Sequence, residues 1–302
     1  MKLKVAFAAS IALLLPACAT PHAKQPAIAI PVDDLPLHGP TPRGETAVSV
    51  AQGVISALTA EHVPAYGFIN GHWTVDDPAT APVLTMWRAA GLPLGNHGWS
   101  HRHLSEMTPA EFEQEFVRNE PLLQTGSEDW HWFRYPFLDE GESAEKRVAA
   151  REVLARHGYK IASVTADFSD WAWTGPYQRC KDAGDTAAIS KLEELYMQAA
   201  RESIGYYRNL SQTVYGREIP YVLLLHVSPF EARMLPRLLK LYREEGFRFA
   251  TLEAVEADPA YHDQIDPKLS AEPQGLDHKA AAKQALPPRT DFQSVLDGMC
   301  KG

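Results

Sequence analysis

Two histidines spaced four residues apart, His97 and His101, stand out in this 302-residue sequence as candidates for chemistry. On one turn of a helix this spacing would bring both imidazoles to the same side, close enough to share a metal ion. Two adjacent acids, Asp33 and Asp34, follow an apolar segment and would repel each other unless a cation lies nearby. Two histidines and one carboxylate leave coordination positions open for water and substrate, which is typical of a catalytic metal site.

Each pair also has an ordinary structural interpretation. Asp33 and Asp34 could open a turn or cap a helix, with Pro36 and Gly39 close behind them. Histidine pairs on protein surfaces are common, so His97 and His101 alone carry little weight. The two pairs together favour the metal site.

Further ionisable residues follow other apolar segments. Arg134 could hold a carboxylate in a fixed, ionised orientation through paired hydrogen bonds, or it could form an ordinary surface salt bridge. Asp170, Trp171 and His226 suggest a carboxylate that orients an imidazole beside an aromatic wall. A lone histidine after a buried strand is, however, more often a core residue than a catalyst.

The segments between these residues alternate between strand-like and helix-like patterns. Predicted strands cover 27–32, 65–69, 92–94, 131–134, 159–164, 221–225 and 247–250. Predicted helices cover 46–60, 82–90, 108–123, 143–157, 186–210 and 229–245, and Thr108 and Glu111 form a capping signature. This alternation predicts an α/β fold, a distorted (β/α) barrel of about seven parallel strands with its active site at the C-terminal strand ends.

The N-terminus has the features of an export signal. A short basic region and an apolar stretch from Val5 to Leu15 predict a signal peptide over residues 1–17, too short to span a bilayer. The residues before Cys18 resemble a lipobox, which predicts membrane attachment through a lipidated Cys18; ordinary signal-peptidase cleavage is the alternative. We therefore expect an exported protein, a periplasmic or outer-membrane lipoprotein or otherwise a secreted one.

Composition and domain organisation add further limits. The formal net charge of −9 argues against nucleic acid as a partner. We expect a linker over 18–26, one barrel domain over 27–256, and a polar, proline-punctuated extension over 257–302. Cys180 and Cys300 could form one disulfide or remain two unrelated thiols, because pairing depends on geometry.

The ionisable residues described above belong to five short motifs. Taken in chain order, these motifs resemble those of the polysaccharide deacetylases, the chitooligosaccharide-deacetylase-like carbohydrate esterases. The resemblance covers roughly residues 27–255, and it is specific because all five motifs occur in sequence at strand ends. They are Val32-Asp33-Asp34, His97-Gly98-Trp99-Ser100-His101, Arg134-Tyr135-Pro136, Asp167-Phe168-Ser169-Asp170-Trp171 and Leu224-Leu225-His226.

The resemblance implies one divalent metal ion, most often Zn²⁺, with Co²⁺ or another divalent ion accepted by some members. It implies that Asp34, His97 and His101 are the metal ligands. The implied catalytic residues are the general base Asp33, its tether Arg134, Tyr135 with an oxyanion-stabilising backbone N–H, the general acid His226 and its partner Asp170. Trp171 would line the sugar-binding groove and bind substrate.

Three departures from the family pattern concern the substrate site. Leu35 stands where the family has glycine, with Pro36 and His38 after it, and Val227 stands where aspartate is common. The long segment 177–217, between the last two motifs, is expected to help form the groove. None of these departures removes a proposed ligand or proton carrier.

The predicted function is metal-dependent hydrolysis of the N-acetyl group of an N-acetylhexosamine-containing glycan, with release of acetate. One alternative is a catalytically silent, carbohydrate-binding relative, which loss of Asp33, a metal ligand or His226 would favour. The other is an amidase that acts on a non-sugar amide. Several tryptophans near the motifs favour sugar stacking but could equally fill the barrel, namely Trp99, Trp130, Trp132, Trp171 and Trp173.

Overall fold

A computed structural model describes residues 25–126, 129–269, 272–273 and 275–301. The predicted signal peptide, most of the linker and Cys18 lie outside these residues. Within the described part of the chain, no helix is both long enough and apolar enough to cross a membrane.

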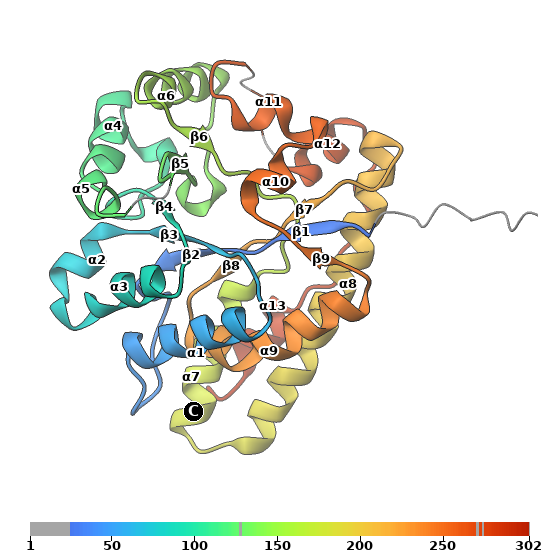
Figure 1. Ribbon diagram of the computed structural model, residues 1–302. Coiled ribbons are helices and arrows are strands. Elements are labelled where there is room, and N and C mark those ends of the chain that lie inside the picture. Colours follow the sequence, from blue (N-terminus) through green and yellow to red (C-terminus); the bar gives the residue numbers. More distant parts are fainter. Residues whose placement is uncertain (1–24, 127–128, 270–271, 274, 302) are drawn as a thin grey trace, which may run out of the picture.

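Short parallel strands form the centre of the molecule, with helices around them (Figure 1). One sheet has six strands in the order β6-β5-β4-β3-β2-β8, and the other has three in the order β7-β1-β9. The strands are β1 (Ala27–Ala29), β2 (Pro31–Leu35), β3 (Tyr66–Ile69), β4 (Leu94–Asn96), β5 (Trp132–Phe133), β6 (Lys160–Ile161), β7 (Tyr221–Val222), β8 (Leu225–His226) and β9 (Arg248–Phe249).

The two sheets are linked into a distorted ring. β1 and β2 are consecutive parts of one chain segment, and β7 and β8 are consecutive parts of another. In each segment the first strand belongs to the three-stranded sheet and the second to the six-stranded sheet, so both segments connect the two sheets. The segment after β6 reaches β7 through a single bridge between Ala166 and Leu223. Parallel strands and crossover helices confirm the predicted α/β class, although the ring closes through this bridge and not through a continuous ladder of strands.

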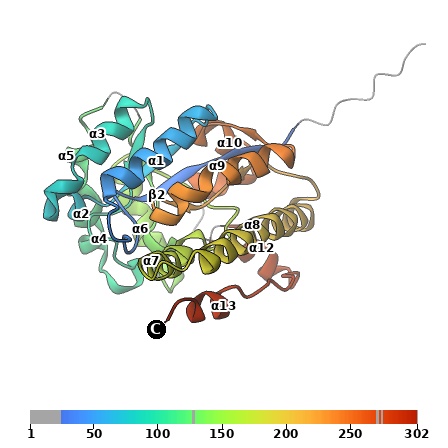
Figure 2. The same ribbon diagram turned by 90° about the horizontal axis from the view of Figure 1, so that it is seen from below.

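The main helices cover the outside of the strands. They are α1 (Ala47–Ala60), α2 (Gly71–Asp76), α3 (Pro82–Ala89), α4 (Pro109–Val117), α5 (Glu120–Leu123), α6 (Ala144–Arg156), α7 (Thr174–Asp182), α8 (Thr186–Tyr215), α9 (Pro229–Glu244), α10 (Leu252–Glu256), α11 (His262–Ile265), α12 (Leu276–Ala282) and α13 (Gln293–Gly298). Helices α1 and α9 lie side by side (Figure 2). Val50, Val54 and Leu58, which recur at helical spacing in α1, are all buried, each stabilising the fold by about 1.5–3 kcal/mol.

Two predicted elements are interrupted. The helix predicted over 108–123 starts with the expected capping box at Thr108 and Glu111 but divides into α4 and α5. Pro121 lies in the first turn of α5 and has no N–H to continue the helical hydrogen bonds of α4. The strand predicted over 221–225 is also divided, because Leu223 N–H donates to Ala29 while Leu224 N–H donates to Ala166 on the other side.

The C-terminal extension packs on the barrel as helices α11 to α13. Tyr261, Leu276 and Leu296 are buried in the main hydrophobic core. Cys180 and Cys300 form a disulfide with an S–S distance of 2.09 Å, which joins α7 to the residues after α13. The pairing that the sequence left open is thus present.

Candidate active site

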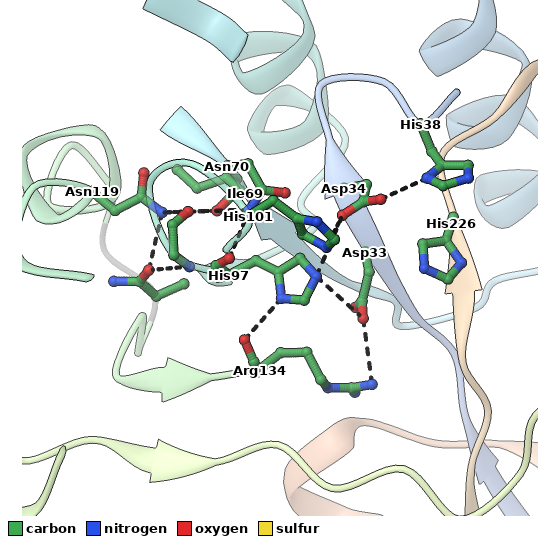
Figure 3. A network of polar contacts seen from close by, with 12 residues as sticks. Asp33, Asp34, His38, Ile69, Asn70, His97, His101, Asn119, Arg134 and His226 are labelled. Carbon is green, nitrogen blue, oxygen red and sulfur yellow. Dashed lines mark hydrogen bonds and ion pairs between the residues drawn. The ribbon is translucent and has the colours of Figure 1, made fainter. Parts of the chain in front are cut away.

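Asp33 and Asp34 lie at the C-terminal end of β2, and both are buried. In a regular strand, neighbouring side chains point to opposite faces. Asp34 instead has a φ of 65°, and the register between β2 and β3 shifts between Val32 and Leu35. This local irregularity allows both carboxylates to face the same site (Figure 3).

His97 and His101 lie in the loop after β4, and the prediction that one helical turn brings them together is wrong. The loop is irregular, and His101 has a φ of 52°. The ring centroids of the two histidines are nevertheless 5.0 Å apart. Loop geometry therefore achieves what a helical turn was expected to do.

Asp34 and the two histidines form a group that could hold a metal ion. Asp34 Oδ1 lies 3.4 Å from His97 Nε2 and 3.2 Å from His101 Nε2. The same oxygen is buried and has no hydrogen-bond partner among the described residues. An orphaned carboxylate oxygen between two imidazole nitrogens fits a divalent cation that prefers nitrogen and oxygen ligands.

The protonation states also suit a metal site. His97 Nδ1 lies 2.8 Å from the carbonyl oxygen of Arg134 and donates to it, so Nε2 is the nitrogen that faces Asp34 and could bind an ion. Burial, together with the nearby His97, lowers the pKa of His101 to about 3, which keeps this imidazole neutral. Burial alone would raise the pKa of Asp34, but the hydrogen bond from His38 and the nearby His97 and His226 imidazoles hold this pKa well below its usual value.

Three buried asparagines that belong to none of the sequence motifs hold the loop that carries the histidines. Figure 3 shows two of them, Asn70 and Asn119. Asn70 donates to the carbonyl oxygens of His97 and Gly98. Asn119 donates to the carbonyls of Ile69 and Gly98. Asn96 accepts from the N–H of Gly98. Asn70 and Asn96 directly follow or end a buried strand, which was the available sequence signal.

Arg134 lies behind Asp33 but does not hold it in the predicted way. One guanidinium nitrogen is 3.5 Å from Asp33 Oδ2, and none of the three has a hydrogen-bond partner among the residues described. The predicted paired hydrogen bonds are therefore wrong. The guanidinium lies over the ring of Phe68, 5.1 Å from its centroid.

His226 and Asp170 form the predicted acid–imidazole pair. Asp170 lies in a short 3-10 helix (Asp170–Trp173), and its Oδ1 is 2.9 Å from His226 Nδ1. Its other oxygen accepts from the backbone N–H of His226 at 2.7 Å. Burial alone would lower the pKa of His226, but Asp170 and the more distant Asp34 and Asp33 raise it to about 10. The imidazole is therefore held as a proton donor.

A cavity of about 420 Å³ joins these groups. All the predicted site residues line it except Arg134 and Asp170, which stand behind Asp33 and His226. Tyr135 forms part of its wall, and Trp171 lies at the rim with 45% of its surface exposed. Trp99, Trp132 and Trp173 are buried, so these three fill the core as the alternative interpretation held.

The surroundings of the cavity include two features of the sequence that depart from the family pattern, the segment 177–217 and His38. No residue of the segment 177–217 is among the described residues that line this cavity. Tyr207 of α8 instead lines a neighbouring cavity, which shares Tyr135, Leu138 and Asp167 with it, so the segment lies beside the site. In the sequence, His38 is part of a departure from the first motif. His38 lines the cavity, and its Nδ1 donates to Asp34 Oδ2 at 2.6 Å.

A cavity at the C-terminal strand ends, with a His-His-Asp group, a second carboxylate and an acid–imidazole pair, is typical of metal-dependent hydrolases. Residues 21–162 match the model of a family described as polysaccharide deacetylase. This match confirms the resemblance that the motifs indicate. It covers the first three motifs and ends before Asp170 and His226.

Solved structures show the same fold at low sequence identity. The chitin deacetylase from the fungal pathogen Colletotrichum lindemuthianum is 18% identical, over 77% of this chain and 88% of that one, with a TM-score of 0.53. A peptidoglycan N-acetylglucosamine deacetylase, Bc1960, is 16% identical over 77% of this chain and 88% of its own chain, with a TM-score of 0.50. BA3943, a CE4 family pseudoenzyme from Bacillus anthracis, is 13% identical over 78% of this chain and 66% of its own chain, with a TM-score of 0.53.

Proposed function

We propose that the protein is a metal-dependent N-deacetylase that releases acetate from an N-acetylhexosamine-containing glycan. The observation that supports this most strongly is the convergence of Asp34, His97 and His101 in one cavity with Asp33 and His226. The family match over residues 21–162 supports the same reaction class.

Each residue has a definite task in this reaction. A divalent ion held by Asp34, His97 and His101 would polarise the acetamide carbonyl and activate water. Asp33 accepts the proton of the attacking water. Arg134 places its positive charge 3.5 Å from Asp33 Oδ2, beside the base. The N–H of Tyr135 stabilises the oxyanion.

The second half of the reaction needs an acid, because an amine leaves poorly unless it is protonated. His226 donates this proton from Nε2, since Nδ1 is bound to Asp170. Asp33 and His226 thus move protons at different points of one cavity. Both products, acetate and a glucosamine-type amine, leave through its open side.

The exposed aromatic side chains at the rim favour a sugar over a simple amide. Trp171 and Phe137 line the cavity and remain 45% and 55% exposed. Flat aromatic faces stack well on the apolar faces of pyranose rings. The substrate would be an oligosaccharide or polymer whose neighbouring rings contact this rim.

The first test is acetate release by zinc- or cobalt-loaded protein from chitin-type and peptidoglycan-type oligosaccharides, compared with simple acetamides. We expect turnover only on the glycans. Equal turnover on acetamides would support the non-sugar amidase, and no turnover on any substrate would support a silent relative.

Substitution of the proposed base provides the second test. Asp33→Asn should reduce the rate of acetate release by about 10²–10⁴-fold, because the amide cannot accept the water proton. Metal content, measured by elemental analysis, should remain that of the wild type. His97→Ala should lose metal and activity together. Near-normal turnover of Asp33→Asn would contradict the assignment of the base.

We also propose that the protein is exported and attached to a membrane through a lipidated Cys18. The disulfide between Cys180 and Cys300 supports an oxidising compartment, since cytosolic proteins rarely keep disulfides. Labelling with a fatty-acid analogue tests lipidation directly, and Cys18→Ala should lose the label. A mature form that starts at another residue and carries no lipid would support plain secretion.

A further inference from the structure

A second group of potential metal ligands lies beside the first and shares Asp34 with it. The ligand atoms of Asp34, His38 and His226 all lie within 4.8 Å of one another. The rings of His38 and His226 are adjacent, with centroids 4.8 Å apart, and both lie on the opposite side of Asp34 from His97 (Figure 3). Two imidazoles and a carboxylate suit zinc, copper, nickel or cobalt.

The two oxygens of Asp34 serve the two groups separately. Oδ1 is the oxygen closest to His97 and His101, whereas Oδ2 contacts His38 at 2.6 Å. A carboxylate can bridge two cations with one oxygen each, and ions in such sites lie about 3.5–4 Å apart. Asp34 therefore has one oxygen for each group.

The nitrogens of the second group are positioned and accessible. Asp170 accepts a hydrogen bond from His226 Nδ1 and fixes the ring, so Nε2 is the nitrogen that can bind an ion, with release of its proton to solvent. His38 offers Nδ1 once its proton has moved to Nε2, and its side chain is 23% exposed. An ion can thus reach this position from the solvent through the cavity.

We infer that Asp34, His38 and His226 form a second, weaker binding site for a divalent transition-metal ion such as Zn²⁺, and that its occupation inhibits the enzyme. The site is weaker because the ion displaces the hydrogen bond between His38 and Asp34 and is repelled by the first cation. Inhibition follows because the ion takes the ring nitrogen from which His226 donates its proton. This last step rests on the proposed function, whereas binding of the second ion does not.

Metal stoichiometry tests the site without reference to activity. Protein stripped with a chelator is dialysed against increasing Zn²⁺, and bound zinc per chain is measured by elemental analysis. We expect two ions in the wild type, the second bound at least tenfold more weakly, and one ion in His38→Ala. A wild-type protein that saturates at one ion would overturn the inference.

Two further variants separate ligation from other effects. His38→Asn retains a side-chain N–H that can donate to Asp34 but lacks the imidazole nitrogen, so it should also bind one ion. Two ions in this variant would contradict the role of His38. His157→Ala is the matched control, because His157 contacts Glu113 at the same 2.6 Å but belongs to neither ligand group. It should bind two ions.

Zinc inhibition provides the functional measurement. Acetate release by the wild type should rise with the first equivalent of Zn²⁺ and fall at least fivefold at saturation of the second. His38→Asn should keep its maximal rate under the same excess. If the wild type binds two ions but keeps full activity, the inhibitory role is wrong although the site exists. If no variant releases acetate, the proposed function fails while the stoichiometry still decides the site.

Discussion

Single atoms of a few side chains determine what the cavity can do. Asp170 uses both of its oxygens on His226, one for the backbone N–H and one for Nδ1. A carboxylate is suited to this position because it accepts at both oxygens, whereas an amide accepts at one and donates at the other. The orientation of the His226 ring thus depends on a charged, two-oxygen acceptor.

Asp170→Asn should therefore lower kcat by about 10²-fold or more, because an amide group placed against two donors cannot hold the ring in its productive orientation. We expect KM and bound metal to change little, since Asp170 does not line the cavity. Steady-state kinetics with a metal determination measure all three quantities. A large rise in KM at unchanged kcat would show that Asp170 acts on substrate binding instead.

At the scale of elements, the packing of α8 against α9 buries an acid. Glu231, in the first turn of α9, is 2% exposed and accepts a hydrogen bond from Tyr196 of α8. Burial, with the negative charge of Asp170 nearby, raises the pKa of Glu231 to about 8 from 4.5. The neutral, protonated form is therefore the one that suits this helix contact.

This shift makes stability depend on pH. A folded-state pKa above the unfolded one contributes stability that is complete below pH 4.5 and is lost as the pH rises through about 8. The Glu231→Gln side chain stays neutral at every pH. Between pH 5 and 8, the free energy of unfolding of the wild type should therefore fall by up to about 1.4 kcal/mol per pH unit relative to that of this variant. Urea denaturation at a series of pH values measures this difference.

The control lies on the same helix. Glu244→Gln changes an exposed acid of α9 that pairs only loosely with Lys240, at 3.6 Å. Its unfolding free energy should follow that of the wild type across the pH range. Parallel curves for Glu231→Gln and the wild type would show that Glu231 ionises in the folded protein as it does in the unfolded chain.

At the scale of the whole molecule, the C-terminal extension is part of the barrel and not a separate unit. Its residues Tyr261, Leu276 and Ala280 lie in the same core as the strands. The buried Arg151 of α6 donates to backbone carbonyls of residues 263, 264 and 266. The disulfide then joins the last residues to α7, which directly follows the 3-10 helix that carries Asp170.

Shortening the extension should therefore destabilise the protein in steps. A chain that ends at residue 287 loses α13 and the disulfide, and its free energy of unfolding should fall by about 2–4 kcal/mol. A chain that ends at residue 257 also loses the three core side chains. Loss of a large buried side chain such as Tyr261 or Leu276 lowers the free energy of unfolding by about 2–5 kcal/mol, so this chain should not fold. Denaturation curves and near-ultraviolet circular dichroism distinguish the two forms. If the chain ending at residue 257 unfolds like the full chain, the extension is dispensable.

The sequence by itself determined the order of the main strands and helices, the polar residues at strand ends and the capping box at Thr108. These features are local, because they depend on periodicity and on contacts within a few residues. The resemblance carried by the motifs added the set of site residues, and the structure brings these residues together in one region. Their catalytic roles remain predictions.

Only the tertiary structure decided how these residues meet. The left-handed backbone at Asp34 and the loop after β4, held by Asn119 from a distant segment, replace the regular strand and helical turn expected there. The same folding places His38 against His226, and Cys300 against Cys180. Such contacts join residues far apart in the sequence, and no local pattern encodes the distance between two such side chains.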